Sequence, residues 1–307
     1  MKTPAVSFEF FPPSDEPSAR HLWETIRRLQ PLQPKFVSVT DGADGSTRAR
    51  TRECVLRISR ETNLCVAPHM TCVGTSREEA LALAQDYARH GIRQLVALRG
   101  DRPNLIPRAT GDDSLRRDSF VYASDLVAAL AATTHVEISV AAYPEGHPES
   151  AGVAADIDNL KRKIDAGAHR AITQFFFDTE VYLRYRDRCT TAGIHIPIIP
   201  GILPITRFAQ LQRFATRCGA SLPNWLHERL AGLDDDPDTR RLIASNVAIE
   251  QIQRLQADGV DEFHFYTLNR AELTYAICHA IGVRPRAKSA VQVACASPVS
   301  ATIAANG

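Results

Sequence analysis

Short runs of apolar residues recur along the chain, and a longer segment with the spacing of an amphipathic helix follows each one. The runs are rich in β-branched and aromatic residues, which favour strands. The clearest helix is predicted over Pro237–Asp258, where Asp236 fits the N-cap and Gly259 fits the position after the last turn. The predicted strands are Ala5–Phe10, Phe36–Thr40, Cys65–Thr71, Gln94–Arg99, Val136–Ala142, Arg170–Phe176, Ile196–Ile202 and Glu262–Thr267.

Regular alternation of strands and helices predicts parallel strand pairing. A nearly continuous apolar run such as Gln94–Leu98 is typical of a sheet that is covered on both faces. No Gly-x-Gly-x-x-Gly follows a strand, which counts against a Rossmann domain. The pattern therefore predicts an α/β fold, a single-domain (β/α)8 TIM barrel over residues 1–285. The aperiodic segment 286–307 is expected to be a disordered tail, and the long polar loop Asp101–Ser119 is expected to be functional or mobile.

Composition narrows the class of protein. The chain carries 36 basic and 35 acidic residues, so no general attraction to nucleic acid is expected. It has no apolar run long enough to span a membrane and no secretory signal. Seven scattered cysteines without a CxxC pair predict free thiols and a cytoplasmic location. Cys65, His69 and Cys72 do not match the spacing of zinc sites, so no metal is predicted.

The active site of such a barrel lies at the carboxyl ends of its strands. Glu9 ends the first predicted strand between Phe8, Phe10 and Phe11. Apolar surroundings should raise the pKa of its carboxyl group, as a general acid near neutral pH requires. The alternative is a glutamate that reaches solvent. The same rule selects the following strand-end residues: Glu9, Thr40, His69, Arg99, Asp101, Tyr143, His147, Gln174 and Tyr266.

Two polar groups have the composition of a phosphate or cofactor site. Gly100 permits close approach of the backbone to a ligand, while Arg99 suits a phosphate and Asp101 a polar ring edge. An ordinary turn beside a surface arginine is the alternative. The helix predicted over about Ala155–Ala166 places cations near its N-terminus, where a pyrophosphate can bind, although a solvated polar face gives the same pattern. Its polar residues are Asp156, Asn159, Arg162 and Lys163.

A series of segments then carries a family resemblance. The first is Val6-Ser-Phe-Glu-Phe-Phe-Pro-Pro13, and the others are Lys35–Thr40, Ala67–Cys72, Val96–Asp101, Ala141–Glu145, Asp165–Ala168, Ile172–Asp178, Pro200–Pro204 and Phe263–Arg270. In this order the segments resemble methylenetetrahydrofolate reductases of the bacterial short form, over nearly the whole chain. The resemblance implies a barrel enzyme that reduces 5,10-methylenetetrahydrofolate to 5-methyltetrahydrofolate through FAD and so supplies methyl groups for methionine synthesis.

The resemblance also assigns roles to individual residues. It implies ping-pong chemistry in which NADH or NADPH reduces the flavin before the folate is reduced, with Glu9 as the acid that protonates N10. Asp101 would tune the flavin and contact the folate. The implied cofactor contacts are Thr40, His69, Arg99, Gly100, Asp101, Tyr122, Ala123, Tyr143, His147, Asp156, Asn159, Arg162 and Lys163. The implied substrate contacts are Gln174, Gln210, Phe214 and Arg270.

Several alternatives stay open at this point. Many members of the family carry a tyrosine after Thr40, where this chain has Asp41. This difference puts the flavin contact expected at that position in doubt. Another flavin barrel enzyme resembling proline dehydrogenase, a non-catalytic folate- or flavin-binding protein, and a flavin-free one-carbon transferase are the rival functions. The sequence does not choose between NADH and NADPH, and a homo-oligomer is expected only by resemblance.

Overall fold

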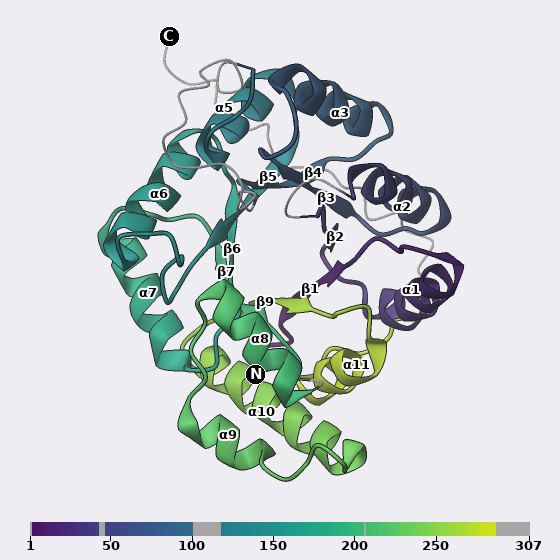
Figure 1. The fold of residues 1–307 in the computed structure, drawn as a ribbon, viewed down its shortest axis with the longest axis vertical. Helices are drawn as coiled ribbons and strands as arrows, with labels where there is room; N and C mark the ends of the chain where they lie inside the picture. The colour runs from purple at the N-terminus through teal and green to yellow at the C-terminus, as the bar shows by residue number, and fades with distance from the viewer. Residues whose placement is uncertain (1, 43–46, 101–117, 206, 287–307) are drawn as a thin grey trace.

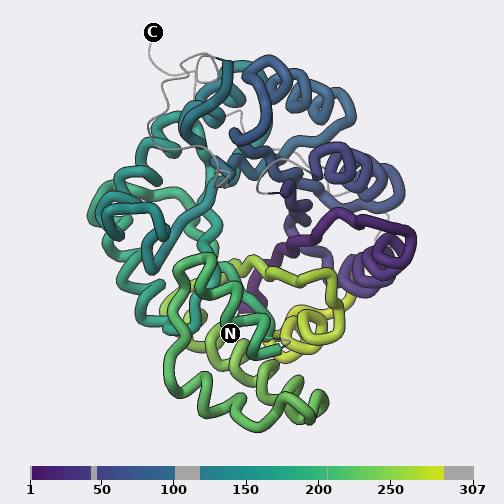
Figure 2. The backbone as a smooth tube through the Cα atoms, viewed as in Figure 1, coloured from purple at the N-terminus to yellow at the C-terminus, as the bar shows by residue number. Residues whose placement is uncertain are grey.

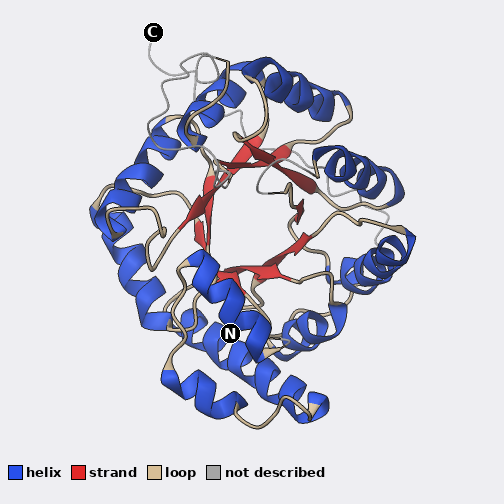
Figure 3. Ribbon diagram, viewed as in Figure 1, coloured by secondary structure: helices blue, strands red, loops and turns tan. Residues whose placement is uncertain are grey.

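Nine short parallel strands form a ring that helices surround (Figures 1 and 3). The computed structural model describes residues 2–42, 47–100, 118–205 and 207–286. The strands are β1 (Ala5–Phe10), β2 (Val37–Val39), β3 (Val66–Thr71), β4 (Gln94–Leu98), β5 (Glu137–Ala142), β6 (Arg170–Thr173), β7 (Ile198–Ile199), β8 (Gly201–Ile202) and β9 (Glu262–Tyr266). Their order is β7-β6-β5-β4-β3-β2-β1-β9-β8. The predicted barrel fold is confirmed. Asp101, nearly all of the Asp101–Ser119 loop and the tail from residue 287 lie outside the described residues.

The strand predicted over Ile196–Ile202 is two short strands instead of one. β7 pairs with β6, whereas β8 pairs with β9. Pro200 lies between them and has no N–H to give to a strand ladder. Its carbonyl oxygen still accepts a hydrogen bond from the main-chain N–H of His264 at 3.0 Å. β7 therefore continues the sheet from β6, and β8 continues it from β9. Together the two short strands close the barrel.

The helices form the outer layer of the molecule. They are α1 (Glu16–Leu29), α2 (Arg48–Glu61), α3 (Arg77–Arg89), α5 (Ala123–Thr133), α6 (Val153–Asp165), α7 (Thr179–Thr191), α8 (Phe208–Cys218), α9 (Asn224–Leu230), α10 (Pro237–Ala257) and α11 (Ala271–Ala280), with a 3-10 turn over Gln30–Leu32. At α10 the Asp236 side chain accepts the N–H of Thr239 at 3.0 Å, and Gly259 has a φ of 83° just past the end. Both predicted caps are confirmed.

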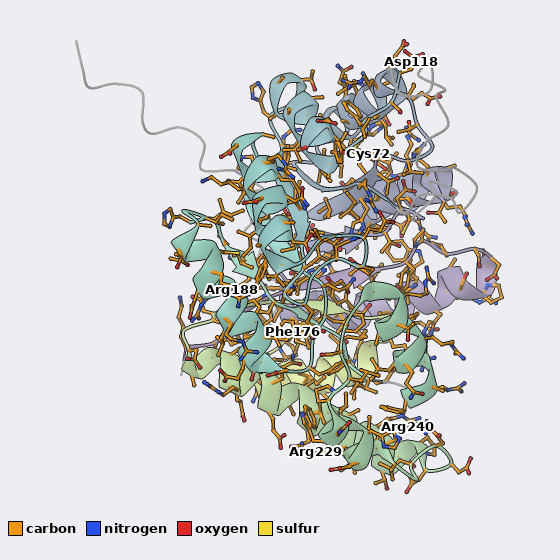
Figure 4. The ribbon with its side chains drawn as sticks, turned by 60° about the vertical axis from the view of Figure 1, so that its left-hand side comes forward. Cys72, Asp118, Phe176, Arg188, Arg229 and Arg240 are labelled. Carbon is orange, nitrogen blue, oxygen red and sulfur yellow. The ribbon has the colours of Figure 1, made fainter. Side chains whose placement is uncertain are left out.

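Helices α8, α9 and α10 extend the molecule on one side. The α8 trace lies in front of the ring of strands in Figure 2. Figure 4 places Arg229 and Arg240 at the end formed by α9 and α10, opposite Asp118. The guanidinium of Arg240 donates to the carbonyl oxygens of Leu233 and Asp234, both at 2.6 Å. This arginine therefore fixes the turn between the two helices.

Side chains alternate between two apolar layers along each strand. Phe8 and Phe10 belong to the large core between the sheet and the helices, which also contains Ile26 of α1. A second, small cluster is Phe36, Ala67, Val96 and Ile172. Because successive side chains of a strand point to opposite faces, Ser7 and Glu9 face the barrel interior.

Two simpler expectations have mixed outcomes. No helix among the described residues is long and apolar enough to cross a membrane. Cys54, Cys72, Cys189 and Cys278 are buried free thiols, as predicted. Cys65 is disulfide-bonded, so the prediction of free thiols is wrong at that position.

Candidate active site

Glu9 lies among polar side chains from three neighbouring strands. Its Oε2 is 3.2 Å from Nε2 of His69 on β3 and 3.6 Å from Nε2 of His264 on β9. The hydroxyl of Ser38 on β2 donates to the same oxygen at 3.3 Å. Glu9 is the fifth of six residues in β1, so the cluster lies toward the carboxyl ends of the parallel strands.

The pKa of Glu9 differs from the sequence-based expectation. Burial alone raises the pKa of the carboxyl group, but the charge of His69 and hydrogen bonds with His264 and His69 outweigh it and lower the pKa to about 2. The expected rise is therefore wrong. Its stated cause was the flanking phenylalanines, yet Phe8 and Phe10 project to the opposite face of β1 and pack against the outer helices.

A cavity of about 700 Å³ opens at the same end of the barrel, beside the ends of β4 and β5 and the helices α5 and α6. This volume suits a cofactor-sized ligand. Nine of the predicted cofactor contacts line it: Arg99, Tyr122, Ala123, Tyr143, His147, Asp156, Asn159, Arg162 and Lys163. Gly100 directly follows Arg99 in the chain, whereas Thr40 and His69 are not among the lining residues. His69 belongs to the Glu9 cluster instead.

The cavity brings three cations together. Arg99 forms an ion pair with Glu149 at 2.8 Å, and Arg162 donates to the side chain of Asn159. The Lys163 side chain is half-buried, and its ammonium donates to the carbonyl oxygen of Ala141 at 2.7 Å. Burial lowers the pKa of Lys163 to about 8. An anionic ligand would compensate this cluster of positive charge.

Loop residues after β5 shape the mouth of the cavity. The carboxylate of Asp156 accepts the main-chain N–H of His147 at 2.7 Å, which fixes the loop to the first turn of α6. The rings of Tyr143 and His147 meet edge to face with 4.8 Å between centroids. Gly146, between them, has a φ of 92°, a conformation that favours glycine. The loop is thus held in one defined geometry.

The predicted substrate contacts do not line this cavity. Gln174 follows β6, and its side-chain oxygen accepts the N–H of Phe175 at 3.0 Å. Gln210 and Phe214 are half-buried on α8, and Arg270 precedes α11 as an exposed residue. The roles of these four residues, and of Asp101, stay predictions.

Asp41 is enclosed by protein groups. Its carboxylate accepts hydrogen bonds from Thr71 at 3.2 Å and Thr47 at 3.3 Å, and lies 3.7 Å from Nε of Arg48. Burial raises the pKa of Asp41, although Arg48 opposes the rise. Asp41 therefore joins β3 to the start of α2.

Sequence reasoning missed three residues at the site. Glu149 pairs with Arg99, Glu145 contacts the loop after α8, and His264 lies behind Glu9. Only Glu145 and Glu149 had a local signal, as acidic residues in a loop that follows a strand end. Within the described ranges, no group of three or more His, Cys, Asp or Glu side chains could hold a metal ion.

Comparisons with known proteins agree on one family. The family model described as methylenetetrahydrofolate reductase matches residues 1–282. The 5,10-methylenetetrahydrofolate reductase of Pectobacterium carotovorum is 52% identical over 280 residues, and that of Escherichia coli K12 is 51% identical, each match covering 91% of both chains. The Arabidopsis thaliana protein named methylenetetrahydrofolate reductase (NADH) 1 is 33% identical over 92% of this chain and 49% of its own.

A solved structure of an uncharacterized Clostridium thermocellum protein, which binds two copies of 5-methyl-5,6,7,8-tetrahydrofolic acid, has a similar fold. The TM-score is 0.59 at 14% identity, with 91% of this chain and 94% of that chain covered. Fold, family model and sequence identity over nearly the whole length thus lead to one conclusion. The chain belongs to the methylenetetrahydrofolate reductase family.

Proposed function

We propose that this protein binds FAD and reduces 5,10-methylenetetrahydrofolate to 5-methyltetrahydrofolate at the expense of NADH or NADPH, in two separate half-reactions. The observation that carries the proposal is the placement of a cation-rich cavity and of the Glu9 carboxylate, whose side chain is only 13% exposed, at the same end of one barrel. The product would supply methyl groups for methionine synthesis in the cytoplasm. The NADH in the name of the Arabidopsis relative favours NADH as the donor.

The residues around the cavity fit FAD. Arg99, Arg162 and Lys163 supply positive charge for a diphosphate, although Arg162 and Lys163 lie in the last turn of α6 and not near its N-terminus as the sequence suggested. When bound, FAD accepts a hydride from the nicotinamide and passes it to the folate. Tyr143, His147, Gly100, Thr40 and His69 are proposed to border the flavin. Asp101 is proposed to contact the flavin and the folate.

Glu9 provides the proton that the folate needs. The methylene carbon accepts a hydride once the five-membered ring has opened, which requires a proton on N10. Because two histidine side chains lie within 3.6 Å of Oε2, one proton can be shared among the three groups. Glu9 then transfers this proton to N10, and the neighbouring histidine restores it. Gln174, Gln210, Phe214 and Arg270 are proposed to bind the substrate.

The two half-reactions provide the test. FAD-loaded protein is mixed without oxygen, first with NADH and then with methylenetetrahydrofolate, while the visible flavin absorbance is followed. Wild-type protein is expected to lose and regain this absorbance. Glu9→Gln should lose it at the normal rate but regain it more slowly by at least about a hundredfold, since general acids contribute factors of that order. A variant that reduces folate at the wild-type rate would refute the role of Glu9, and protein that takes up no FAD would refute the function.

A further inference from the structure

Behind Glu9 the barrel interior holds a pair of buried polar residues, Ser7 and His264, and the proposed mechanism uses His264 only as a neighbour that shares a proton. Ser7 and His264 face each other in the register of β1 and β9. The exposed fraction is 0% for Ser7 and 1% for His264. The Ser7 Oγ and the His264 Nδ1 are 2.8 Å apart, so the two side chains share a hydrogen bond. Burying a histidine in an apolar core is costly unless its ring nitrogens have partners.

The ring of His264 is held in one orientation. It stacks on Phe36 with 5.7 Å between centroids and an interplanar angle of 18°. On another side it meets the ring of Tyr266 edge to face at 5.3 Å. Tyr266 is itself fixed, because its hydroxyl donates to the carbonyl oxygen of Thr173 at 2.7 Å. With Nδ1 directed at Ser7, the other ring nitrogen is directed at Glu9, 3.6 Å away.

The hydrogen bonds define which protons can move. The Ser7 hydroxyl has a second partner, the carbonyl oxygen of Phe263 at 3.5 Å, to which it can only donate. Ser7 then accepts from Nδ1–H of His264. With Nδ1 protonated, Nε2 either accepts a proton from the Glu9 carboxyl or, in the charged ring, donates to the Glu9 carboxylate. One proton can therefore move between Nε2 and Oε2 while the bonds to Ser7 remain unchanged.

We propose that His264, oriented by Ser7, is a positioning residue that shares a proton with Glu9 and so sets the pH range in which Glu9 can protonate the folate. This inference rests on the proposed function. The other ionisable groups nearby are His69 from β3 and Tyr266 from β9, both described above. Beyond the Phe36 ring lies the guanidinium of Arg170, which is paired with Glu137.

The direction of the effect follows from the geometry. The folate half-reaction requires one proton on the cluster formed by Glu9 and its two histidines, and its rate falls on the alkaline side as that shared proton is lost. Because His264 is one of the groups that hold this proton, its removal lowers the affinity of the cluster for it. Without His264 this alkaline limb should lie at lower pH. The NADH half-reaction needs no proton from Glu9 and serves as an internal reference.

The test uses FAD-loaded His264→Gln and Ser7→Ala, with Ser139→Ala as the matched control because Ser139 is a buried serine on the distant strand β5. Both half-reactions are followed by stopped-flow absorbance from about pH 5 to pH 9, the range in which such limbs are observed. His264→Gln is expected to move the alkaline limb of the folate half-reaction downward by roughly one pH unit, and Ser7→Ala to move it in the same direction by less. In both variants the rate of the NADH half-reaction should stay within about twofold of wild type. In the Ser139→Ala control the rates of both half-reactions should stay within the same limit.

Two results would overturn the inference. One is a folate half-reaction that is uniformly slower in both variants but has an unchanged pH profile, because that result describes a purely structural role. The other is an equal change in both half-reactions. If His264→Gln fails to fold, the pH profile of Ser7→Ala tests the inference alone, because this variant removes one hydroxyl and leaves the imidazole ring of His264 in place. Failure of the proposed function is separate, because the wild-type protein would then transfer no electrons from NADH to the folate.

Discussion

The carboxylate of Glu145 accepts hydrogen bonds from both the side chain and the main chain of Ser221, with 3.0 Å between the Glu145 Oε1 and the Ser221 hydroxyl. This contact joins the loop after β5 to the loop after α8. Next to it, Gly219 has no side chain and a φ of 72°, and a Cβ there would lie 3.0 Å from the ring of Pro148. The loop that borders the cavity is thus tied to the helix that carries Gln210 and Phe214.

Glu145→Ala is therefore expected to weaken substrate binding more than chemistry. Loss of these bonds releases the end of α8 at a cost of about 1–2 kcal/mol, which corresponds to a rise in KM for the folate of roughly fivefold to thirtyfold. The value of kcat should change by less than about threefold. Steady-state kinetics measure both constants. Glu180→Ala, which breaks an exposed ion pair with Arg254 on the outer helices, should change neither. A fall in kcat at constant KM would contradict this role.

Lys163 predicts a pH dependence of cofactor binding. Burial lowers the pKa of its ammonium to about 8, so the charged form prevails below that pH and is lost above it. A bound diphosphate favours the charged form, and the affinity for FAD should therefore fall as the pH rises through this value.

Lys163→Met should weaken FAD binding by about tenfold or more, since a hydrogen bond from a charged donor contributes about 1.5–3 kcal/mol. It should also flatten the pH dependence between about pH 7 and pH 9. Quenching of flavin fluorescence gives the dissociation constants. Lys161→Met is the matched control on the same helix, because Lys161 is exposed and directed to the carbonyl oxygen of Ala192. Equal losses in the two variants would refute the assignment of Lys163.

The fold could be predicted because each helix and strand shows its own regular spacing of apolar residues in the sequence. The bounds of β1 agree with the sequence, and those of α10 differ by one residue. The break at Pro200 was readable in principle from the missing N–H, but which half pairs with which neighbour depends on barrel closure. Local sequence patterns therefore predicted the helices and strands. The pairing of the two short strands around Pro200 depends on the whole sheet and could not be predicted from them.

The site was harder to predict, because its energetics depend on residues distant in the chain. The strand-end rule selected Glu9 and His69, and the structure brings them to 3.2 Å. The apolar residues beside Glu9 in the sequence gave the wrong sign for its pKa, since neighbours in sequence occupy the opposite face of a strand. His264 is recruited from the other end of the chain by β1–β9 pairing, which no local motif records.

Gly201 is a position where the barrel wall tolerates no side chain. A Cβ on this residue would lie 2.3 Å from the carbonyl oxygen of Thr173 and 2.5 Å from Cε2 of Tyr266. Gly201→Ala is expected to lower the free energy of unfolding by about 2–4 kcal/mol, because the backbone cannot yield as a flexible side chain could. The Gly232→Ala variant should lose only about 1 kcal/mol, since Gly232 has open space around it and a φ of 74°. Urea unfolding midpoints compare the two, and equal losses would contradict this packing.

Asp41 predicts how stability changes with pH. Burial raises the pKa of its carboxyl group in the folded state above the value of 3.8 that applies to the unfolded chain. Just above pH 3.8 the folded protein therefore binds more protons at this residue than the unfolded chain does. The contribution of Asp41 to the free energy of unfolding then falls as the pH rises through that window.

Asp41→Asn removes this titration and keeps a side chain of the same shape beside Thr71 and Thr47. The stability of the variant relative to wild type should therefore improve as the pH rises from below 4 to neutral, whatever the constant cost of losing the ion pair with Arg48. Urea unfolding at several pH values gives the difference. Asp178→Asn is a useful control, because the Asp178 side chain is 43% exposed and its ion pair with Arg184 is long at 4.0 Å. A relative stability that is constant with pH, or that worsens as the pH rises, would mean that the positive charge of Arg48 outweighs burial at Asp41.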